Sequence, residues 1–299
     1  MNHLAVNHRT GILLVMLAGT FWSLGGLIIR LMEAAGPWQI LFYRSLSIAV
    51  MLYVVLNIVH GRNFTRVVKS SGWASVIAGI GIAIAFAGFI LSISYTTAAN
   101  TFFLLATQPI LIAIIAWPIL GERVNRATQT ATFVVLCGVA IMVAEGLALG
   151  TLFGNIMGLV SALGFTIFTI ALRWEQQADM MPSLLYGSTI ATCVAALALT
   201  FYDTDFRVTL HDGSLCALLG IIQIGLGTWC YTIGSRAVPA AELGLLAMTE
   251  IVLGPIWVWL FLAEMPTIWT LVGGTLIIVV LCCLAVMQWR KPQVMAVPG

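Results

Sequence analysis

Residues 98–122 read AANTFFLLATQPILIAIIAWPILGE, and residues 240–264 read AAELGLLAMTEIVLGPIWVWLFLAE. The two stretches align without gaps at an offset of 142, and nine of their 25 positions are identical. Shared leucine, isoleucine and alanine mean little in so apolar a chain. The more informative identities are Thr107/Thr249, Trp117/Trp259 and Glu122/Glu264. These matches indicate that one structural unit occurs twice in the chain.

The beginnings of the two units agree at nearly the same offset. The matching positions are Gly11/Gly154, Trp22/Phe165, Ser23/Thr166, Arg30/Arg173 and Tyr43-Arg44-Ser45/Tyr186-Gly187-Ser188. Accidental similarity between apolar helices is the alternative explanation. We therefore predict a duplication with one repeat in residues 1–150 and the other in residues 151–299.

The amino-acid composition indicates a membrane protein. Of its 299 residues 61% are hydrophobic and only 8% are charged, with a mean hydropathy of +1.06. A soluble domain carries roughly 25% charged residues. Apolar runs of about 20 residues, long enough to cross a hydrocarbon core of roughly 30 Å, recur along the sequence. Ten spans are predicted, at 11–32, 38–60, 72–95, 99–120, 127–146, 154–174, 183–203, 214–236, 240–262 and 267–289.

The basic residues predict the orientation of these spans. If the N-terminus is cytoplasmic, ten of the 13 Lys and Arg residues fall on the cytoplasmic side, against Arg30 and Arg207 outside and Arg44 within a span. This agrees with the positive-inside rule. The first span is expected to be retained rather than cleaved as a signal peptide, because the repeat needs it. Each repeat holds five spans, an odd number, so the second must enter the membrane inverted, an arrangement that recurs in alternating-access carriers.

Other classes of protein fit the sequence less well. A net charge of +2 is far from the strongly basic balance of a nucleic-acid binder. The six cysteines all fall within predicted spans and are interpreted as packing residues, so no metal site or cofactor is expected. No HExxH or GxSxG motif is present, which argues against an enzyme. Rings of charge typical of a channel are not visible, and a non-transporting scaffold or receptor stays an alternative.

The chain resembles the drug/metabolite transporter superfamily, specifically its ten-span EamA-type exporters. The residues that carry the likeness, besides the duplication, are Trp22-Ser23-Leu24-Gly25, Arg44, Pro109 and Gly121-Glu122-Arg123. The second repeat departs from the pattern with Ala263-Glu264-Met265. Among these exporters the chain is most similar to the YddG type, and that resemblance implies export of amino acids, including aromatic ones. Efflux of drugs or toxic compounds, or transport of nucleosides or other metabolites, is the alternative.

Charged and polar residues deep within spans are candidate substrate-binding or coupling residues. Glu250 lies about ten residues into its span, where a charge costs about 2.5–3.5 kcal/mol on insertion scales. Its repeat counterpart is Gln108, so the pair is expected near the pseudo-two-fold axis. The pair could hydrogen-bond a substrate, and Glu250 could also take up a proton. A polar clamp between helices is the alternative.

Arg44 is the second candidate. It could bind a substrate carboxylate, pair with Glu250, or snorkel to the interface. Trp257 shares a helix face with Glu250 and, with Trp22 and Tyr43, could form a cavity for an aromatic substrate, although each could instead face lipid. Pro109 and Pro255 are candidate hinges or static bends.

The expected protein is thus a carrier for a small-molecule substrate in the inner membrane. Ten spans supply both halves, so a monomer would suffice. If the duplication is as described, labelling of cysteines added to each tail will place both termini on the cytoplasmic side. Tails labelled on opposite sides of the membrane would contradict the odd-numbered repeat.

Overall fold

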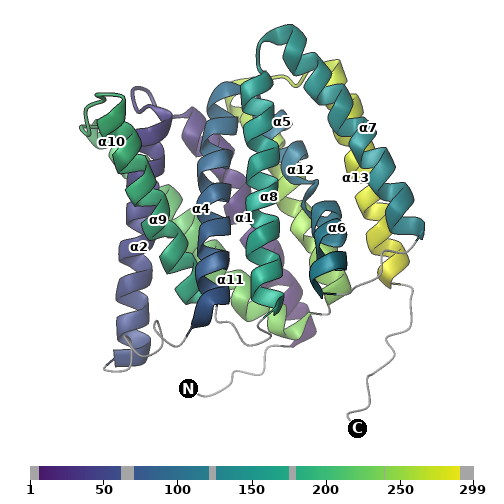
Figure 1. The fold of residues 1–299 in the computed structure, drawn as a ribbon, viewed down its shortest axis with the longest axis horizontal. Helices are drawn as coiled ribbons and strands as arrows, with labels where there is room; N and C mark the ends of the chain where they lie inside the picture. The colour runs from purple at the N-terminus through teal and green to yellow at the C-terminus, as the bar shows by residue number, and fades with distance from the viewer. Residues whose placement is uncertain (1–6, 62–70, 121–125, 175–179, 239, 290–299) are drawn as a thin grey trace.

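The computed structural model describes residues 7–61, 71–120, 126–174, 180–238 and 240–289, apart from a few side chains within these ranges. Helices fill almost all of this part of the chain, and it contains no strand (Figure 1). The all-α membrane fold predicted from the sequence is confirmed.

The helices follow the predicted spans. The first half contains α1 (His8–Arg30), α2 (Pro37–His60), α4 (Gly72–Tyr95), α5 (Ala98–Leu105), α6 (Gln108–Leu120) and α7 (Arg126–Leu149). The second half contains α8 (Leu152–Trp174), α9 (Met180–Phe201), α10 (Leu210–Leu218), η2 (Leu219–Leu226), α11 (Gly227–Gly234), η3 (Ser235–Ala237), α12 (Ala240–Leu262) and α13 (Ile268–Trp289). Every predicted limit lies within four residues of the observed end of its span.

These elements make ten crossings in the described residues. Eight contain an apolar helical stretch of at least 18 residues, and the last two are apolar over the described parts Thr249–Leu262 and Ile268–Cys283. The chain start of α1 and the chain end of α13 lie at the same end of the bundle, which we call the terminal face (Figure 1). The opposite end is the distal face, which the basic residues predict to be external.

Local sequence explains several helix starts. Asn7, Thr97 and Thr209 each accept a hydrogen bond from the backbone amide three residues later, as N-cap side chains do. Pro37 begins α2, where its missing N–H costs nothing. Gly150, with φ of 73°, ends α7 in the left-handed conformation that glycine adopts without strain. It leads directly into α8, so the two halves are joined by a very short link.

Two crossings are irregular. The fourth is interrupted between α5 and α6, because Pro109 has no N–H to donate to the carbonyl of Leu105. At this break both the hydroxyl and the backbone amide of Thr107 donate to the Leu104 carbonyl, at 2.7 and 3.1 Å. The eighth crossing contains η2, a π-helical segment between α10 and α11. Short π-helical segments are found mostly inside α-helices and frequently at functional sites.

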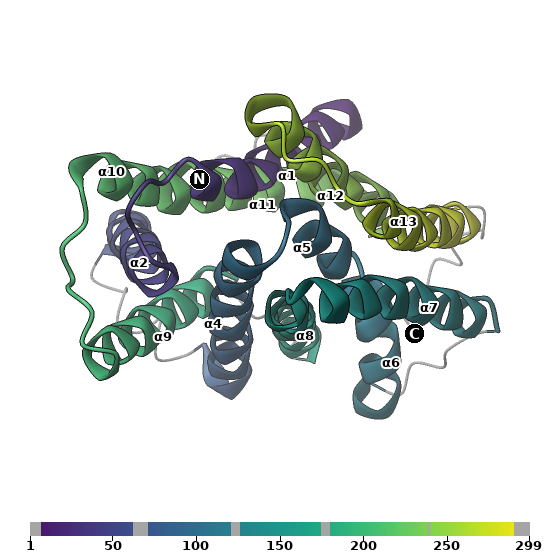
Figure 2. The ribbon, with the colours of Figure 1, turned by 90° about the horizontal axis from the view of Figure 1, so that it is seen from above.

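The two halves are arranged as inverted repeats, and each major contact has its counterpart. Helix α4 of the first half packs on α8 of the second, and the counterpart of this contact is the packing of η2 and α11 on α1. Likewise α1 packs on α12, and its counterpart is the packing of α8 on α5 and α6. Helices α2 and α9 pair with each other, as do α7 and α13. Seen from above, α2 and α9 lie at one side of the molecule and α7 and α13 at the other (Figure 2). The boundary predicted between residues 150 and 151 stays a prediction.

Glycines allow the backbones to approach closely where α4 meets α8 and α9. A Cβ added at Gly164 would lie 2.5 Å from the amide nitrogen of Ala85, and one at Gly187 would lie 2.7 Å from the carbonyl oxygen of Gly79. In lipid no hydrophobic effect drives helices together, because the surrounding solvent is itself apolar. Helices associate there through close packing, which small residues allow. This three-helix contact is therefore the close-packed side of the fold.

The distal face is held by buried polar contacts between loops. The Asp212 carboxylate accepts hydrogen bonds from the backbone amides of Glu33, Ala34 and Ala35, at 2.8–3.1 Å. The side chain is fully buried. Asp212 is therefore not a solvated loop residue, although it lies in the first turn of a helix at the end of the bundle. A carboxylate that accepts several backbone N–H groups locks the α1–α2 connection onto α10.

A second contact at this face joins the first half to the second. Arg30 Nε lies 3.1 Å from Glu264 Oε2, and Arg30 Nη2 donates to the Thr96 carbonyl at 2.6 Å. Glu264 Oε1 accepts from the amide of Ala98 at the start of α5, at 2.7 Å. The ends of α1, α4 and α12 are thereby tied together. Glu122, the repeat counterpart of Glu264, lies outside the described residues.

A third contact is a side-chain network across four crossings and the end of α4. The Asn100 amide donates to Asn155 Oδ1 and to Thr96 Oγ1, and Asn100 Oδ1 accepts from Thr270 Oγ1. Thr270 also contacts Glu145 Oε2 at 3.1 Å. These contacts hold α5, α7, α8 and α13 together at the distal face. Polar side chains therefore tie four crossings together at this end of the described bundle.

Replacing Asp212 tests how much the distal contacts contribute. We expect Asp212→Ala to lower stability by about 3 kcal/mol, since three buried amides lose a charged acceptor. The measurement is thermal unfolding of the purified protein in detergent. Asp205→Ala removes an exposed carboxylate from a neighbouring loop and should leave the unfolding temperature unchanged. Equal stability of the two variants would contradict the structural role of Asp212.

Candidate functional site

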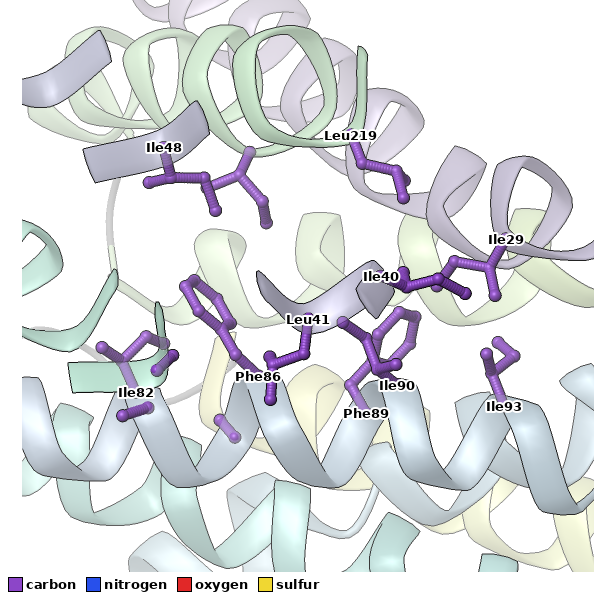
Figure 3. Packing of buried hydrophobic residues seen from close by; sticks show 14 of the residues in the cluster. Ile29, Ile40, Leu41, Ile48, Ile82, Phe86, Phe89, Ile90, Ile93 and Leu219 are labelled. Carbon is purple, nitrogen blue, oxygen red and sulfur yellow. The ribbon is translucent and has the colours of Figure 1, made fainter. Parts of the chain in front are cut away.

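The Arg44 guanidinium is the most unusual group in the membrane core. Arg44 is the eighth residue of α2 and is 2% exposed. Its Cζ atom lies 4.8 Å from the ring centroid of Phe86 and 5.7 Å from that of Phe89. Both rings project from α4 toward α2 (Figure 3). Cation–π contacts of this kind stabilise a buried cation by about 2 kcal/mol, but they use none of its N–H groups.

Arg44 also has donors without acceptors. Its Nε and Nη1 atoms are buried and make no hydrogen bond. An unpaired donor in a low-dielectric interior costs about 1–3 kcal/mol, and more on a charged group. The burial shows that Arg44 does not snorkel to the interface, one of the roles considered for it. A guanidinium in this state is suited to receive an anion that forms two parallel N–H···O bonds.

Gln223, in η2, lies in the same cluster. It is 3% exposed, and its Nε2 donates to the backbone carbonyl of Trp22 at 2.9 Å. Its Oε1 is buried without a partner. A Cβ added at Gly25 of α1 would lie 2.7 Å from Gln223 Nε2 and 3.4 Å from the Phe89 ring. The amide of Gln223 and the cation of Arg44 are therefore both placed around Phe89.

The repeat shows how this cluster arises. In the close-packed contact, a Cβ added at Gly81 of α4 would meet the amide of Phe168 on α8, at 2.7 Å. At the offset of 142–143, Gly81 corresponds to Gln223 and Phe168 corresponds to Gly25. Arg44 likewise corresponds to Gly187. The second copy of the contact thus carries Arg44 and Gln223 where the first copy carries glycines.

Glu250 lies on α12 next to α1. Its side chain is half-buried, and a Cβ added at Gly19 would lie 3.4 Å from its backbone nitrogen. Helix α1 packs on α12 and also on η2, the segment whose Gly220 packs on the backbone of Arg44. No hydrogen bond or ion pair within 4 Å joins these two described side chains. The predicted direct ion pair is therefore not formed, although the two groups share one region.

The two deep tryptophans, Trp22 of α1 and Trp257 of α12, both make contacts at α1. Trp257 Nε1 donates to Ser23 Oγ at 2.9 Å, which fixes its ring against α1. The Trp22 ring lies 5.4 Å from that of Tyr231 on α11. Both tryptophans also pack against the buried cluster that contains Phe86 and Phe89. Trp22 and Trp257 therefore both make contacts at α1, the helix against which Glu250 of α12 also packs.

The contacts of Tyr43 and Gln108 differ from those of the two tryptophans. The Tyr43 hydroxyl donates to the Phe206 carbonyl at 2.8 Å and so ties α2 to the α9–α10 connection at the distal face. The Tyr43 ring packs against the same buried cluster as Trp22 and Trp257, and a cavity shared by the three rings stays a prediction. Gln108 begins α6, is half-buried, and makes no hydrogen bond with Glu250 in the described structure. Its predicted pairing with Glu250 is not found.

The two candidate hinges differ. Pro109 follows a break in helical structure, whereas Pro255 lies inside α12, which continues through it. A proline inside a continuous helix still removes one backbone hydrogen bond. Motion at either position is not tested by this static arrangement and stays a prediction.

Arg44, Gln223 and Glu250 do not line the nearby cavities. A largely apolar cavity of about 270 Å³ lies among α2, α9, η2 and α11, and another of about 350 Å³ lies at the distal face beside Arg30 and Tyr95. A ligand can reach the buried Arg44 only if helices move. Closure around the charged cluster is a geometric requirement of any binding at this position.

Sequence reasoning missed Gln223 and the two phenylalanines. Gln223 carried a usable signal, since it is an amide well inside the apolar span 214–236. Phe86 and Phe89 carried none, because nothing in an apolar helix distinguishes a ring beside a cation from a ring facing lipid.

Comparison with known proteins agrees with this architecture. The EamA-like transporter family matches twice, over residues 9–144 and 152–286. The pseudopaline exporter CntI of Pseudomonas aeruginosa is 24% identical over 288 residues, covering 95% of this chain and 98% of the relative. An uncharacterized transporter of Archaeoglobus fulgidus is 24% identical over 291 residues, covering 91% and 96%. A solved crystal structure aligns with a TM-score of 0.66 at 17% identity, covering 95% of this chain and all of that one, which supports the fold.

Proposed function

Since the chain belongs to the EamA-like transporter family, and is a multi-pass membrane transporter rather than an enzyme, we propose that it exports small carboxylate-bearing metabolites. Amino acids, including aromatic ones, are the substrates that the site fits best. Arg44 binds the carboxylate, and the helices rearrange around it by alternating access. The export of a small molecule by the relative CntI supports the direction.

One observation carries the proposal: Arg44 is a buried cation with two donors that no protein group satisfies. Burying a charge costs several kcal/mol, and a protein retains such a group where a ligand repays the cost. A carboxylate fits the guanidinium in charge and in geometry. A solvated channel or an inert scaffold would need neither the burial nor the unpaired donors.

The surroundings of Arg44 favour an aromatic or apolar side chain on the substrate. Phe86 and Phe89 lie against the guanidinium, and Trp22 and Trp257 pack against the same cluster. Aromatic rings contact one another favourably at offset or edge-on geometry. Cationic drugs would be repelled by Arg44, which makes multidrug efflux the weaker alternative.

We place the terminal face in the cytoplasm of an inner-membrane protein. The distal face, held by Asp212, Arg30 and the Asn100 network, would then seal the external side. Export requires these contacts to open once the substrate has been bound from inside. A single chain supplies both repeats, so a monomer is sufficient for this cycle.

Flux through purified protein in liposomes tests the role of Arg44. We expect saturable counterflow of at least one neutral or aromatic amino acid in a panel that also holds nucleosides and cationic drugs. Arg44→Met should reduce that flux by about tenfold or more, because a charge-assisted pair is lost. Arg207→Met, which removes an exposed cation, should not change it. Inactivity across the whole panel, or full activity of Arg44→Met, would remove the proposal.

Glu250 is proposed as the site of proton coupling. Neutralising it in Glu250→Gln should slow flux and flatten its dependence on pH, because the side chain can no longer gain or lose a proton during the cycle. Glu33→Gln, in an exposed loop, serves as the control. An unchanged rate together with an unchanged pH profile would leave Glu250 as a polar contact between helices.

A further inference from the structure

The side-chain amide of Gln223 has a hydrogen-bonded nitrogen, Nε2, and an oxygen, Oε1, without a partner. Its nitrogen must face the Trp22 carbonyl, since an amide oxygen at 2.9 Å from a carbonyl oxygen would be repelled. That contact fixes the orientation of the amide. Oε1 is therefore the acceptor left without a donor, in a residue that is only 3% exposed. A buried acceptor in this state calls for a donor from outside the protein's own hydrogen bonds.

The free oxygen belongs to the same cluster as the free donors of Arg44. Gly25 packs against both the Gln223 amide and the Phe89 ring, and the Arg44 guanidinium lies over that ring. Gly220, one turn before Gln223, packs on the backbone of Arg44, since a Cβ added there would lie 2.9 Å from the Arg44 carbonyl oxygen. Unpaired donors and an unpaired acceptor thus occur together without satisfying each other.

We infer that Gln223 selects substrates by accepting an N–H from their amino group, while Arg44 holds their carboxylate. The pattern of free donors and a free acceptor matches a zwitterionic α-amino acid and does not match a simple organic acid. This inference rests on the proposed function and adds the residue that decides between these two classes of substrate.

The π-helical segment explains how Gln223 can do this. Residue 223 lies in the middle of η2, and Gly220 and Gly225 bring that segment against α2, where a Cβ at Gly225 would meet the Met51 side chain. The corresponding position on α4 is Gly81, within a regular α-helix that packs closely on α8. The amide is therefore an addition specific to the second copy of this contact.

The test compares two substrates of nearly the same shape. Phenylalanine and 3-phenylpropionate differ by the amino group, and both carry the carboxylate. Wild-type protein in liposomes should transport phenylalanine at least about tenfold more efficiently, the discrimination expected when a charged hydrogen bond is lost. In Gln223→Leu this ratio should fall to about one, through loss of phenylalanine flux and not through gain of phenylpropionate flux.

A second variant separates the two halves of the amide. Gln223→Glu keeps an acceptor but loses the donor to the Trp22 carbonyl, so selectivity should survive if the acceptor matters. If the only role of Gln223 is its hydrogen bond from η2 to α1, selectivity in Gln223→Glu should be lost, as in Gln223→Leu. Thr228→Val, one turn further along, removes a hydroxyl outside the cluster and should behave as wild type. If Gln223→Leu fails to insert, Gln223→Met replaces it.

The outcomes distinguish the two claims. Transport of neither compound, nor of any other carboxylate, by wild-type protein would refute the proposed function itself. Equal transport of both compounds by wild type would overturn the role of Gln223 alone. Selectivity that persists in Gln223→Leu, or that disappears in Gln223→Glu, would overturn it as well.

Discussion

Polar groups inside this protein must find hydrogen-bond partners within the protein, because the hydrocarbon core contains no water to pair with a donor or acceptor. At the distal face most buried groups are paired: Asp212 accepts three backbone amides, and Asn100 donates to Asn155. Near Arg44 this requirement is not met, since donors of Arg44 and the acceptor of Gln223 stay unpaired. The contrast separates an end of the bundle held by polar contacts from the region in which we propose that a ligand binds.

The duplication makes this contrast possible. Two copies of one helix contact exist, and only one of them is needed as a scaffold. In the α4–α8–α9 contact, Gly81, Gly164 and Gly187 bring backbones together. In the other copy, Arg44 and Gln223 replace two of the three glycine positions; Arg44 lies over Phe86 and Phe89, and Gln223 donates to the Trp22 carbonyl. Inverted symmetry thus supplies the frame of the transporter, and departure from symmetry supplies the polar groups of its proposed site.

Much of the fold could be predicted because lipid imposes simple constraints on sequence. Ten apolar stretches had to be helices, and the match of 98–122 with 240–264 required two units of five crossings. Arg44 and Glu250 could be singled out for the same reason, since charges at that depth are costly. Tyr43 and Gln108 were grouped with them from their depth in the span and their position in the repeat. Neither depth nor repeat position tells which neighbouring side chain a residue contacts.

The sequence by itself determined the number of crossings, their limits, the duplication and the presence of costly charges, because each of these depends on residues close together along the chain. Only the tertiary structure decided that Arg44 stacks on Phe86 and Phe89, that Gln223 meets Gly25, and that Tyr43 and Asp212 hold the distal loops. Those contacts depend on the rotation of each helix about its axis. In a chain that is apolar on nearly every face, packing against neighbouring helices sets that rotation, and the hydrophobic pattern does not.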